Sequence, residues 1–407
     1  MRKYMALSLL CVSATSLLSM QENPAGRFAE CEELFKRSEY QKAAAGYESQ
    51  LGTLNKGDAS QDEVRRAHIN YGETLMALGQ YKKGGEEFEH RLGNTAMGRV
   101  PLQKPWDGSD PKDKTVVVRV EHGLGDTFFA MRNIKQLNAL GATVYVRAQG
   151  FMKAFLERQD GVSGVITNNE QEAALPFDYD VYTLSLPRFV SKHGLKGVET
   201  HDDIAFSEGY LKAREDRVEY WKQQLSNDGA KKRRALVWCA SKYVAGEVRS
   251  LQRDIPLQLL VDALQKDGVV LYSLQGGGHY PISKTEYESR KATGTLGELN
   301  ECDILEDPSL VKTFDDTFDK TCGSFEDTAA VMCVMEGVYS VDTSTGMLAG
   351  ALGAAVKDFH LLLPHESDWR HGVGKPETTP YFSNAKLHWQ QAQGDWSNVV
   401  QDLSKDV

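Results

Sequence analysis

A run of small and hydroxyl-bearing residues in the last quarter of the chain has the composition of an anion-binding turn. It follows an apolar strand and precedes a small-residue helix expected over 347–352. Its members are Asp342, Thr343, Ser344, Thr345, Gly346 and Met347. Backbone N–H groups at the start of a helix, together with the helix dipole, favour a phosphate. Because serine and threonine also occupy such turns simply as helix caps, both interpretations stay open.

A glycine-rich turn in the first half of the chain places a carboxylate after a second strand. The run of valines over 115–120 is typical of a buried parallel strand, and a helix is expected over 128–140. The turn between them contains Gly123, Gly125, Asp126 and Thr127. An exposed carboxylate in this place suits a general base that takes a proton from an attacking hydroxyl. The same spacing equally allows Asp126 to be the N-cap of a helix over 127–140.

Strands and helices alternate along two stretches of the chain, which predicts the elements that position these turns. Strands are expected at 115–120, 143–147, 161–166 and 177–186, and again at 234–240, 269–275 and 359–363. This alternation predicts an α/β fold with two doubly wound, Rossmann-like lobes, over 113–225 and 226–407. The turns at 121–127, 239–253, 275–279 and 342–346 all follow strands. Because the carboxyl ends of parallel strands share one edge, these turns predict a cleft between the lobes.

Residues 27–93 contain an internal repeat at an offset of 41 positions. Leu34, Tyr40, Ala43, Tyr47, Leu51 and Gly52 recur as Leu75, Tyr81, Gly84, Phe88, Leu92 and Gly93. Apolar residues fall at helical spacing in each copy, and small residues stand where two helices would cross, so the segment resembles tetratricopeptide repeats. Two repeats are few for a freestanding solenoid, so we expect them to pack on the part of the chain beyond the linker at 94–112. They form either a groove for a protein partner or a structural cap.

Composition limits the class of partner and compartment. The net charge of −10 over 407 residues, without a dense basic block, argues against nucleic acid as the main partner. Residues 1–20 combine a charged start with a short apolar run, which predicts a signal peptide and export. Among the six cysteines, Cys302, Cys322 and Cys333 are candidates for pairing in an oxidising compartment, and no Cys/His spacing predicts a metal site.

The two turns belong to a series of sequence blocks that together resemble a known protein family. The blocks are WDGSDPKDKTVVVRVEHGLGDTFFAMR, PFDYDVYTLSLP, RDIPL, YSLQ, FEDTAAVM, YSVDTSTGMLAGALG, LLPHESDWR and GDW, in collinear order. With the repeats they cover residues 27–400. The chain thereby resembles tetratricopeptide-repeat proteins whose C-terminal part is similar to family 9 glycosyltransferases, the heptosyltransferase-like group with GT-B architecture.

The resemblance implies transfer of a sugar from a nucleotide-diphosphate donor to a hydroxyl, with inversion and without a metal or other cofactor. The acceptor implied is a glycan, a lipid-linked molecule or a protein. Asp126 matches the family's proposed general base. Arg253 lies where the family has a basic residue, and with residues 342–346 it would stabilise the diphosphate. Gln275, Asp327 and Thr328 lie in further matching blocks as candidate donor contacts, Asp342 as a turn-former or ribose contact, and Gly123, Gly125 and Thr127 in the acceptor-side turn.

Three departures from the family pattern favour another function. Met347 stands where the family usually has histidine, and a thioether cannot donate a hydrogen bond to phosphate. Ala240 replaces a usual glycine, and His122 replaces glutamine. The signal-like start implies export, whereas nucleotide sugars are intracellular. A catalytically degenerate scaffold that binds a protein through its repeats is therefore the alternative, and an epimerase of the same architecture is a third. The Asp178-Tyr179-Asp180 triplet is interpreted as a strand and turn rather than a metal-binding motif.

Overall fold

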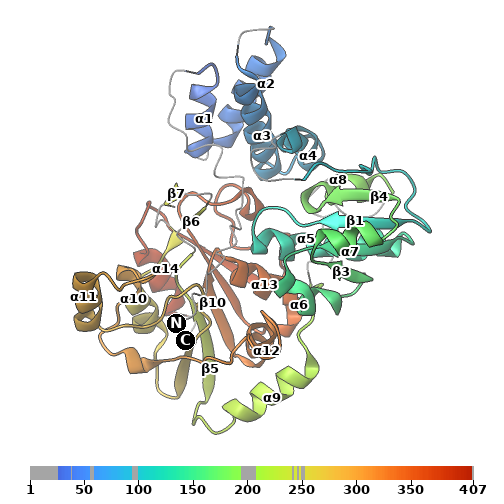
Figure 1. Ribbon diagram of the computed structural model, residues 1–407. Coiled ribbons are helices and arrows are strands. Elements are labelled where there is room, and N and C mark those ends of the chain that lie inside the picture. The colour runs from blue at the N-terminus through green and yellow to red at the C-terminus, as the bar shows by residue number, and fades with distance from the viewer. Residues whose placement is uncertain are drawn as a thin grey trace.

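The computed structural model describes residues 26–37, 39–55, 59–93, 100–193, 208–240, 243–244, 247–248 and 253–405. The expected signal peptide, residues 94–99 of the expected linker and most of the 239–253 turn lie outside these residues. A group of helices stands above two lobes, each built on a parallel sheet (Figure 1). The predicted α/β class with two Rossmann-like lobes and a preceding helical segment is confirmed. No helix in the described ranges has the length and apolar character needed to cross a membrane.

The first lobe contains a four-stranded sheet in the order β3-β2-β1-β4, with every pair parallel. Its strands are β1 (Thr115–Arg119), β2 (Thr143–Arg147), β3 (Gly164–Ile166) and β4 (Tyr179–Tyr182). Its helices are α5 (Leu124–Ala139), α6 (Lys153–Glu157), α7 (Asn169–Ala174) and α8 (Leu186–Ser191), with short 3-10 turns at Gly150–Met152 and Thr183–Ser185. The central strand β1 buries Val116, Val117 and Val118 completely, as expected for a strand covered on both faces.

The second lobe contains a six-stranded parallel sheet in the order β12-β11-β10-β5-β8-β9. Its strands are β5 (Lys232–Val237), β8 (Val269–Ser273), β9 (Val311–Lys312), β10 (Gly337–Val341), β11 (Phe359–Leu363) and β12 (Ala385–Trp389). Its helices are α10 (Leu257–Leu264), α11 (Lys284–Thr293), α12 (Glu326–Val334), α13 (Ser344–Leu352) and α14 (Ser397–Leu403), and η11 (Trp369–His371) is a 3-10 turn. A small antiparallel pair, β6 (Tyr243–Val244) with β7 (Glu247–Val248), follows β5. Helix α9 (Glu215–Leu225) lies against α12 at the lower end of the second lobe in Figure 1.

Several element boundaries differ from those expected. Helix α5 begins at Leu124 rather than Phe128, so Asp126 lies in its first turn instead of in a loop. Gly123 is extended and acts as the N-cap, and its N–H donates to Asp126 Oδ2 over 2.8 Å. Helix α13 likewise begins at Ser344 rather than Met347. The two turns that carry the chemistry are therefore shorter than predicted, and their polar residues are the first residues of helices.

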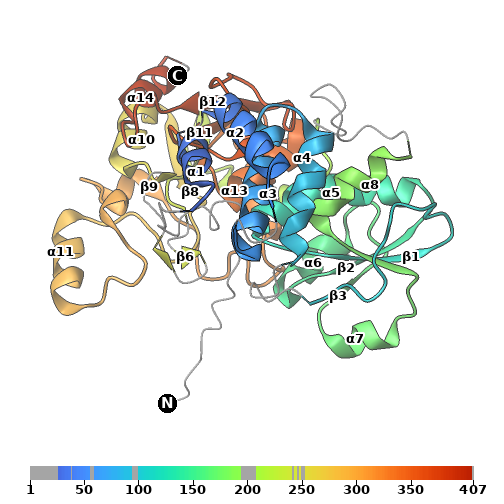
Figure 2. The same cartoon turned by 90° about the horizontal axis from the view of Figure 1, so that it is seen from above.

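The N-terminal helices form two pairs, and the second pair packs on both lobes. They are α1 (Ala29–Lys36), α2 (Tyr40–Gly52), α3 (Gln61–Ala77) and α4 (Tyr81–Phe88), and the 3-10 turn η2 (Glu89–Gly93) follows. Met76 and Tyr81 belong to the same buried core as Val118 of the first lobe and Leu352 of the second. Figure 2 shows α3 and α4 lying over the junction of the lobes. The expectation that the repeats pack on the rest of the chain is confirmed.

Helices α3 and α4 cross at two glycines, as the small residues of the repeat predicted. A Cβ atom at Gly84 would lie 2.8 Å from the carbonyl oxygen of Gly72 and 2.7 Å from Met76 Cγ. A Cβ atom at Gly72 would lie 2.7 Å from the backbone nitrogen of Phe88. The two helices therefore approach so closely that a side chain at either position would push them apart.

We expect Gly84→Ala to lower the free energy of unfolding by about 1–3 kcal/mol, because the added methyl group overpacks the crossing. Gly85→Ala is the matched control, since a Cβ atom there meets nothing within 4 Å. This control should raise stability by about 0.5–1 kcal/mol through helix propensity alone. Urea unfolding of both variants measures the difference, and equal midpoints for the two would contradict the close crossing.

Candidate active site

The first turns of α5 and α13 meet where the two lobes join. A Cβ atom at Gly125 would lie 3.2 Å from Met347 Cγ and 3.5 Å from Ser344 Cα. A side chain at 125 would therefore press on Met347, so the glycine lets the backbone of one lobe approach the other closely. The structure brings the two predicted turns together, but it closes the cleft expected between them at this point.

Asp126 is buried rather than exposed, which corrects the expectation of an accessible carboxylate. Its side chain is 4% exposed, accepts from the Gly123 N–H and forms an ion pair with the guanidinium of Arg370. Asp126 does pair with a backbone N–H at the start of the helix, but it does so as the third residue of α5, and Gly123 takes the N-cap position that was the alternative expectation for Asp126. Burial raises the pKa of Asp126 even though the charge of Arg370 acts in the opposite direction. A carboxyl with a raised pKa is better suited to accept a proton than an ordinary aspartate.

Arg370, in η11 of the second lobe, joins the charges at this junction. Its Nη1 donates to Asp368 Oδ2 over 2.9 Å, and its guanidinium stacks 4.9 Å from the ring centroids of Phe129 and Trp369. Asp368 and Asp126 raise the pKa of Arg370 in spite of its burial, so it remains a cation. The sequence reasoning missed Arg370, although it ends the matching block LLPHESDWR.

Asp342, directly after β10, holds a second cation at the start of α13. Arg253 Nη1 donates to the Asp342 backbone carbonyl over 2.8 Å and lies 3.7 Å from Oδ2. The Nε2 atom of His371 lies 3.5 Å from Asp342 Oδ1. Burial opposes the ionisation of Asp342, but the charges of His371 and Arg253 lower its pKa to about 2. An aspartate that stays ionised positions cations and is a poor proton acceptor at neutral pH.

The start of α13 presents backbone donors beside Arg253. Thr343 is its N-cap, and its Oγ1 accepts from the Gly346 N–H over 3.3 Å. No hydrogen-bond partner for the N–H groups of Ser344 and Thr345 occurs within the described ranges. Both residues are partly exposed. Unpaired donors at a helix start next to a guanidinium are the elements of an anion site.

Four other predicted residues have structural partners of their own. Asp327 Oδ1 accepts from Arg217 and from Trp221 Nε1, and Thr328 Oγ1 donates to Asp319. The expected donor contact at this pair is replaced by a network that joins α9 to α12.

The side-chain oxygen of Gln275 accepts hydrogen bonds from the Trp238 and Cys239 N–H groups after β5, and its Nε2 donates to the Cys239 carbonyl oxygen. Thr127 is buried, and its Oγ1 lies 3.3 Å from the Gly123 carbonyl oxygen, to which it donates.

A shallow depression of about 560 Å³ between α6 and residues 319–324 includes none of the predicted site residues.

Helix α3 contributes a carboxyl to the lobe junction, which no feature of the sequence predicted. Glu73 is 2% exposed, and its Oε1 is buried without a hydrogen-bond partner in the described part of the chain. Burial, and after it the charge of Asp368, raise the pKa of Glu73 well above the ordinary value. Helix α3 packs against η11, the turn that carries Arg370, and the charges of Asp368, Arg370 and Asp126 act on the pKa of Glu73. The helical repeat therefore covers the candidate site directly.

Glu73→Gln should stabilise the protein at neutral pH. A carboxyl whose pKa is higher in the folded than in the unfolded state contributes stability below its ordinary pKa and loses it as the pH rises through the folded value. An uncharged amide of the same size removes this loss. We expect a higher urea midpoint than wild type at pH 7 and a similar midpoint near pH 4, where glutamate is largely protonated in both states. A variant that is less stable by the same amount at both pH values would contradict the burial of an uncompensated carboxyl.

Comparison with known proteins gives a distant set of similarities. No protein-family model matches the chain. Protein FlbA of Caulobacter vibrioides is 24% identical over 345 residues, which cover 80% of this chain and 52% of that protein. The chain thus spans about half the length of the curated relative it matches.

Solved glycosyltransferases are among the structures to which the chain is similar. A family 9 glycosyl transferase from Veillonella parvula has 9% identity and a TM-score of 0.45, and the match covers 69% of this chain and 87% of that one. The E. coli heptosyltransferase WaaC has 13% identity and a TM-score of 0.42 over 72% of this chain and 98% of its own. An O-GlcNAc transferase from Thermobaculum terrenum has 12% identity and a TM-score of 0.33, and the match covers 97% of this chain and 80% of that one.

Proposed function

We propose that the chain transfers a sugar from a nucleoside-diphosphate sugar to a hydroxyl, with inversion and without a metal ion. The observation that carries the proposal is the set of hydrogen-bond donors at the start of α13, which we take as the anion site. Its donors are the N–H groups of Ser344 and Thr345, and Arg253 lies beside them on Asp342. It lies at the carboxyl edge of β10, opposite the turn of the first lobe that carries Asp126.

The anion site would stabilise the leaving group. When the bond between the anomeric carbon and the diphosphate oxygen breaks, the electron pair and negative charge go to the diphosphate. Backbone N–H groups and a guanidinium that are already in place stabilise such a charge at little cost of reorganisation. The hydroxyls of Thr343 and Ser344 are further donors within this turn. Met347 contributes packing against Gly125 rather than a hydrogen bond.

Asp126 would act as the general base on the acceptor. The acceptor oxygen forms the new bond to the anomeric carbon, and its proton passes to the Asp126 carboxylate. For this step the carboxylate must exchange Arg370 for the acceptor, and Gly125 must separate from Met347. A modest opening of the two lobes serves both requirements. Arg370, once released from Asp126, would then be a second cation near the diphosphate.

A thermal-shift series with ADP, GDP, UDP and CDP, in the presence of a chelator, tests the donor site. A ligand that binds only the folded state stabilises it by RT ln(1 + L/Kd), where L is the free ligand concentration, so we expect at least one nucleoside diphosphate to raise the Tm. Arg253→Ala should reduce that increase. Arg290→Ala is the control, because Arg290 pairs with Glu286 on the exposed helix α11. If neither nucleoside diphosphates nor intact nucleotide sugars raise the Tm, the donor site is wrong.

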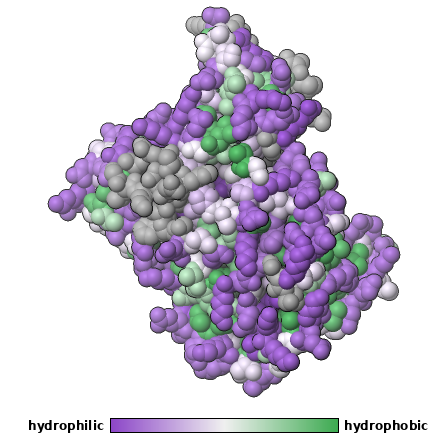
Figure 3. All heavy atoms as spheres, turned by 180° about the vertical axis from the view of Figure 1, so that it is seen from behind, coloured by the Kyte–Doolittle hydropathy of each residue, from purple (hydrophilic) through white to green (hydrophobic). Residues whose placement is uncertain are grey.

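A protein-interaction scaffold is the second candidate function, and the contact of Gly125 with Met347 favours it. That contact and the ion pair of Asp126 are the features of a closed, inactive junction. On the face in Figure 3 the hydrophobic residues gather in small, separate patches rather than one broad apolar surface. A partner on that face would therefore be bound mainly by polar contacts. This function is supported if the full chain captures one protein through residues 27–93 to the same extent with and without nucleotide. It also requires that no nucleotide changes the Tm.

A further inference from the structure

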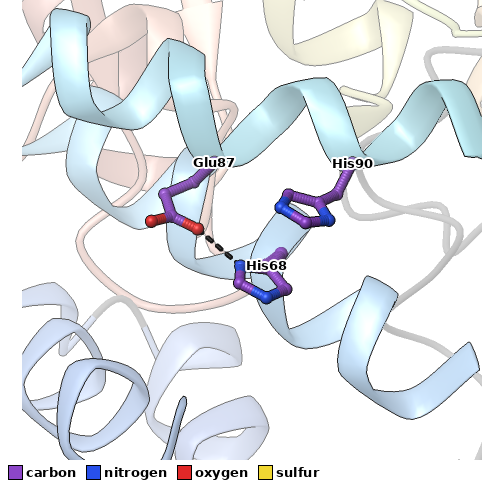
Figure 4. Close-up of side chains that lie close together, drawn as sticks. All are labelled: His68, Glu87 and His90. Carbon is purple, nitrogen blue, oxygen red and sulfur yellow. Dashed lines mark hydrogen bonds and ion pairs between the residues drawn. The ribbon is translucent and has the colours of Figure 1, made fainter. Parts of the chain in front are cut away.

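Three side chains of the helical repeat form a cluster that the proposed transfer does not use. His68 lies on α3, Glu87 on α4 and His90 in η2 (Figure 4). The Nδ1 atom of His68 lies 2.6 Å from Glu87 Oε2, and the two imidazole rings stack at 3.8 Å with an angle of 5° between their planes. One ligand atom from each residue lies within 4.8 Å of the others.

Ordinary packing does not account for this cluster. His90 is exposed and His68 and Glu87 are half-buried, so the rings are not filling an apolar core. Within the described residues, the ring of His90 has a stacking partner but no hydrogen-bond partner. Glu87 and His90 are three residues apart, which places both on one face of a helical segment. His68 approaches that face from the neighbouring helix, so two elements converge on one point (Figure 4).

We propose that His68, Glu87 and His90 bind a transition-metal ion of the Zn²⁺ class. Two imidazoles and a carboxylate are ligands that such ions accept, whereas Mg²⁺ and Ca²⁺ prefer oxygen ligands alone. On binding, the ion replaces the proton shared by His68 Nδ1 and Glu87 Oε2, and this proton passes to solvent. These two atoms then separate from 2.6 Å to the roughly 3.4 Å that ligands about 2.1 Å from a tetrahedral ion require. Because all three side chains reach the surface, the rings have room to turn toward one ion, and a fourth position remains for water.

The ion would fix the end of the helical repeat that meets the first lobe. It would link α3 to the end of α4 next to Arg91, whose Nη2 donates to Glu121 Oε1 of the first lobe over 2.7 Å. Both side chains of that ion pair are 2% exposed. A metal ion that binds only the folded protein stabilises it, so Zn²⁺ should raise the Tm.

The chain provides its own control in a second cluster of Cys239, His279 and Asp303. These three residues are buried. Asp303 Oδ1 already accepts from Trp238 Nε1 over 2.8 Å, and Asp303 Oδ2 lies 2.9 Å from His279 Nδ1. A metal ion would have to displace these internal hydrogen bonds in order to bind there. The affinity for an ion at this second cluster would fall in Cys239→Ser and would not change with substitutions at residue 90.

The test uses the full chain after treatment with a chelator and its removal by dialysis. Equilibrium dialysis with Zn²⁺ measures stoichiometry and affinity, and Co²⁺ in the same protein reports ligand geometry through its visible absorption. We expect one ion per chain in wild type and in Cys239→Ser. His90→Ala should weaken binding by at least about tenfold, since loss of even an outer-shell partner costs about that much. Glu87→Gln should weaken it as well.

Absence of one bound ion in wild type, or unchanged affinity in His90→Ala, would overturn the proposal. So would loss of binding in Cys239→Ser alone. His90 is exposed, so the alanine variant should keep the wild-type fold, which circular dichroism checks. The outcome is independent of nucleotide binding, because the two tests concern different ligands and different residues.

Discussion

Asp126→Asn is expected to lower the rate of sugar transfer by roughly 10²–10⁴-fold, the usual contribution of a general base. The amide keeps an oxygen that can accept from the Gly123 N–H, so the first turn of α5 should stay capped. It cannot take the proton of the acceptor hydroxyl. Release of nucleoside diphosphate from a nucleotide sugar, in the presence of a hydroxyl acceptor, measures the effect. The Tm increase with nucleoside diphosphate should remain, because the donor-binding groups belong to the other lobe.

Asp358→Asn is the matched control for this experiment. Asp358 directly precedes β11, at the edge of the sheet opposite to the candidate site, and pairs with Lys386 over 2.8 Å. Its variant should transfer sugar at the wild-type rate. Full activity in Asp126→Asn would remove Asp126 from the mechanism. Loss of both activity and nucleotide binding in that variant would make Asp126 a structural residue instead of a base.

Arg370→Met is expected to lower the free energy of unfolding by about 3–5 kcal/mol, the usual cost of removing one partner of a buried ion pair. The arginine side chain is 6% exposed, and its removal leaves Asp126 and Asp368 without their shared cation. Asp342 also loses a nearby positive charge. Urea unfolding at pH 7 measures the loss.

Lys212→Met is the control for the buried pair, since the lysine side chain is 64% exposed where it meets Asp160. A solvent-exposed pair contributes at most about 1 kcal/mol. We also expect Asp126→Asn to recover part of the stability lost in Arg370→Met, because it removes one of the uncompensated charges. Equal midpoints for Arg370→Met and Lys212→Met would show that the junction is hydrated and not a buried charge network.

The fold could be predicted from the sequence because its signals are local. The valine run over 115–120 has the composition of a strand buried on both faces, and β1 is the centre of the first sheet. The rule that parallel strands end at one edge predicted that the turns at 121–127 and 342–346 would face each other. Gly125 and Met347 are in contact, so this prediction is confirmed.

The state of the candidate site could not be predicted, because it depends on residues far apart in the chain. Arg370 lies 244 positions after Asp126, and nothing local to the glycine-rich turn indicates that a cation will neutralise it. Glu73 comes from a helix whose polar residues have the pattern of a surface, and only the packing of α3 over both lobes buries it. The expectation that Asp126 could cap the helix placed it one turn too early, because the helix begins at Leu124 and the Asp126 carboxylate accepts from the N–H of the actual N-cap, Gly123.

The cluster of His68, Glu87 and His90 could not be predicted from the sequence either, because its members are brought together only by the packing of two helices. Glu87 and His90 share one helical face, but His68 lies on a different helix. The crossing of α3 and α4 at Gly72 and Gly84 brings the third ligand into place. A search for metal-binding spacing along the sequence therefore misses this cluster, which forms only when the helices pack.

A crystal structure of the full chain with a bound nucleoside diphosphate tests the central claim most directly. We expect the diphosphate oxygens within hydrogen-bond distance of the Ser344 and Thr345 N–H groups and of the Arg253 guanidinium. We also expect the Asp126 carboxylate to face the open space beside them, with its contact to Arg370 broken. A diphosphate bound elsewhere, with Gly125 still packed against Met347, would contradict the account.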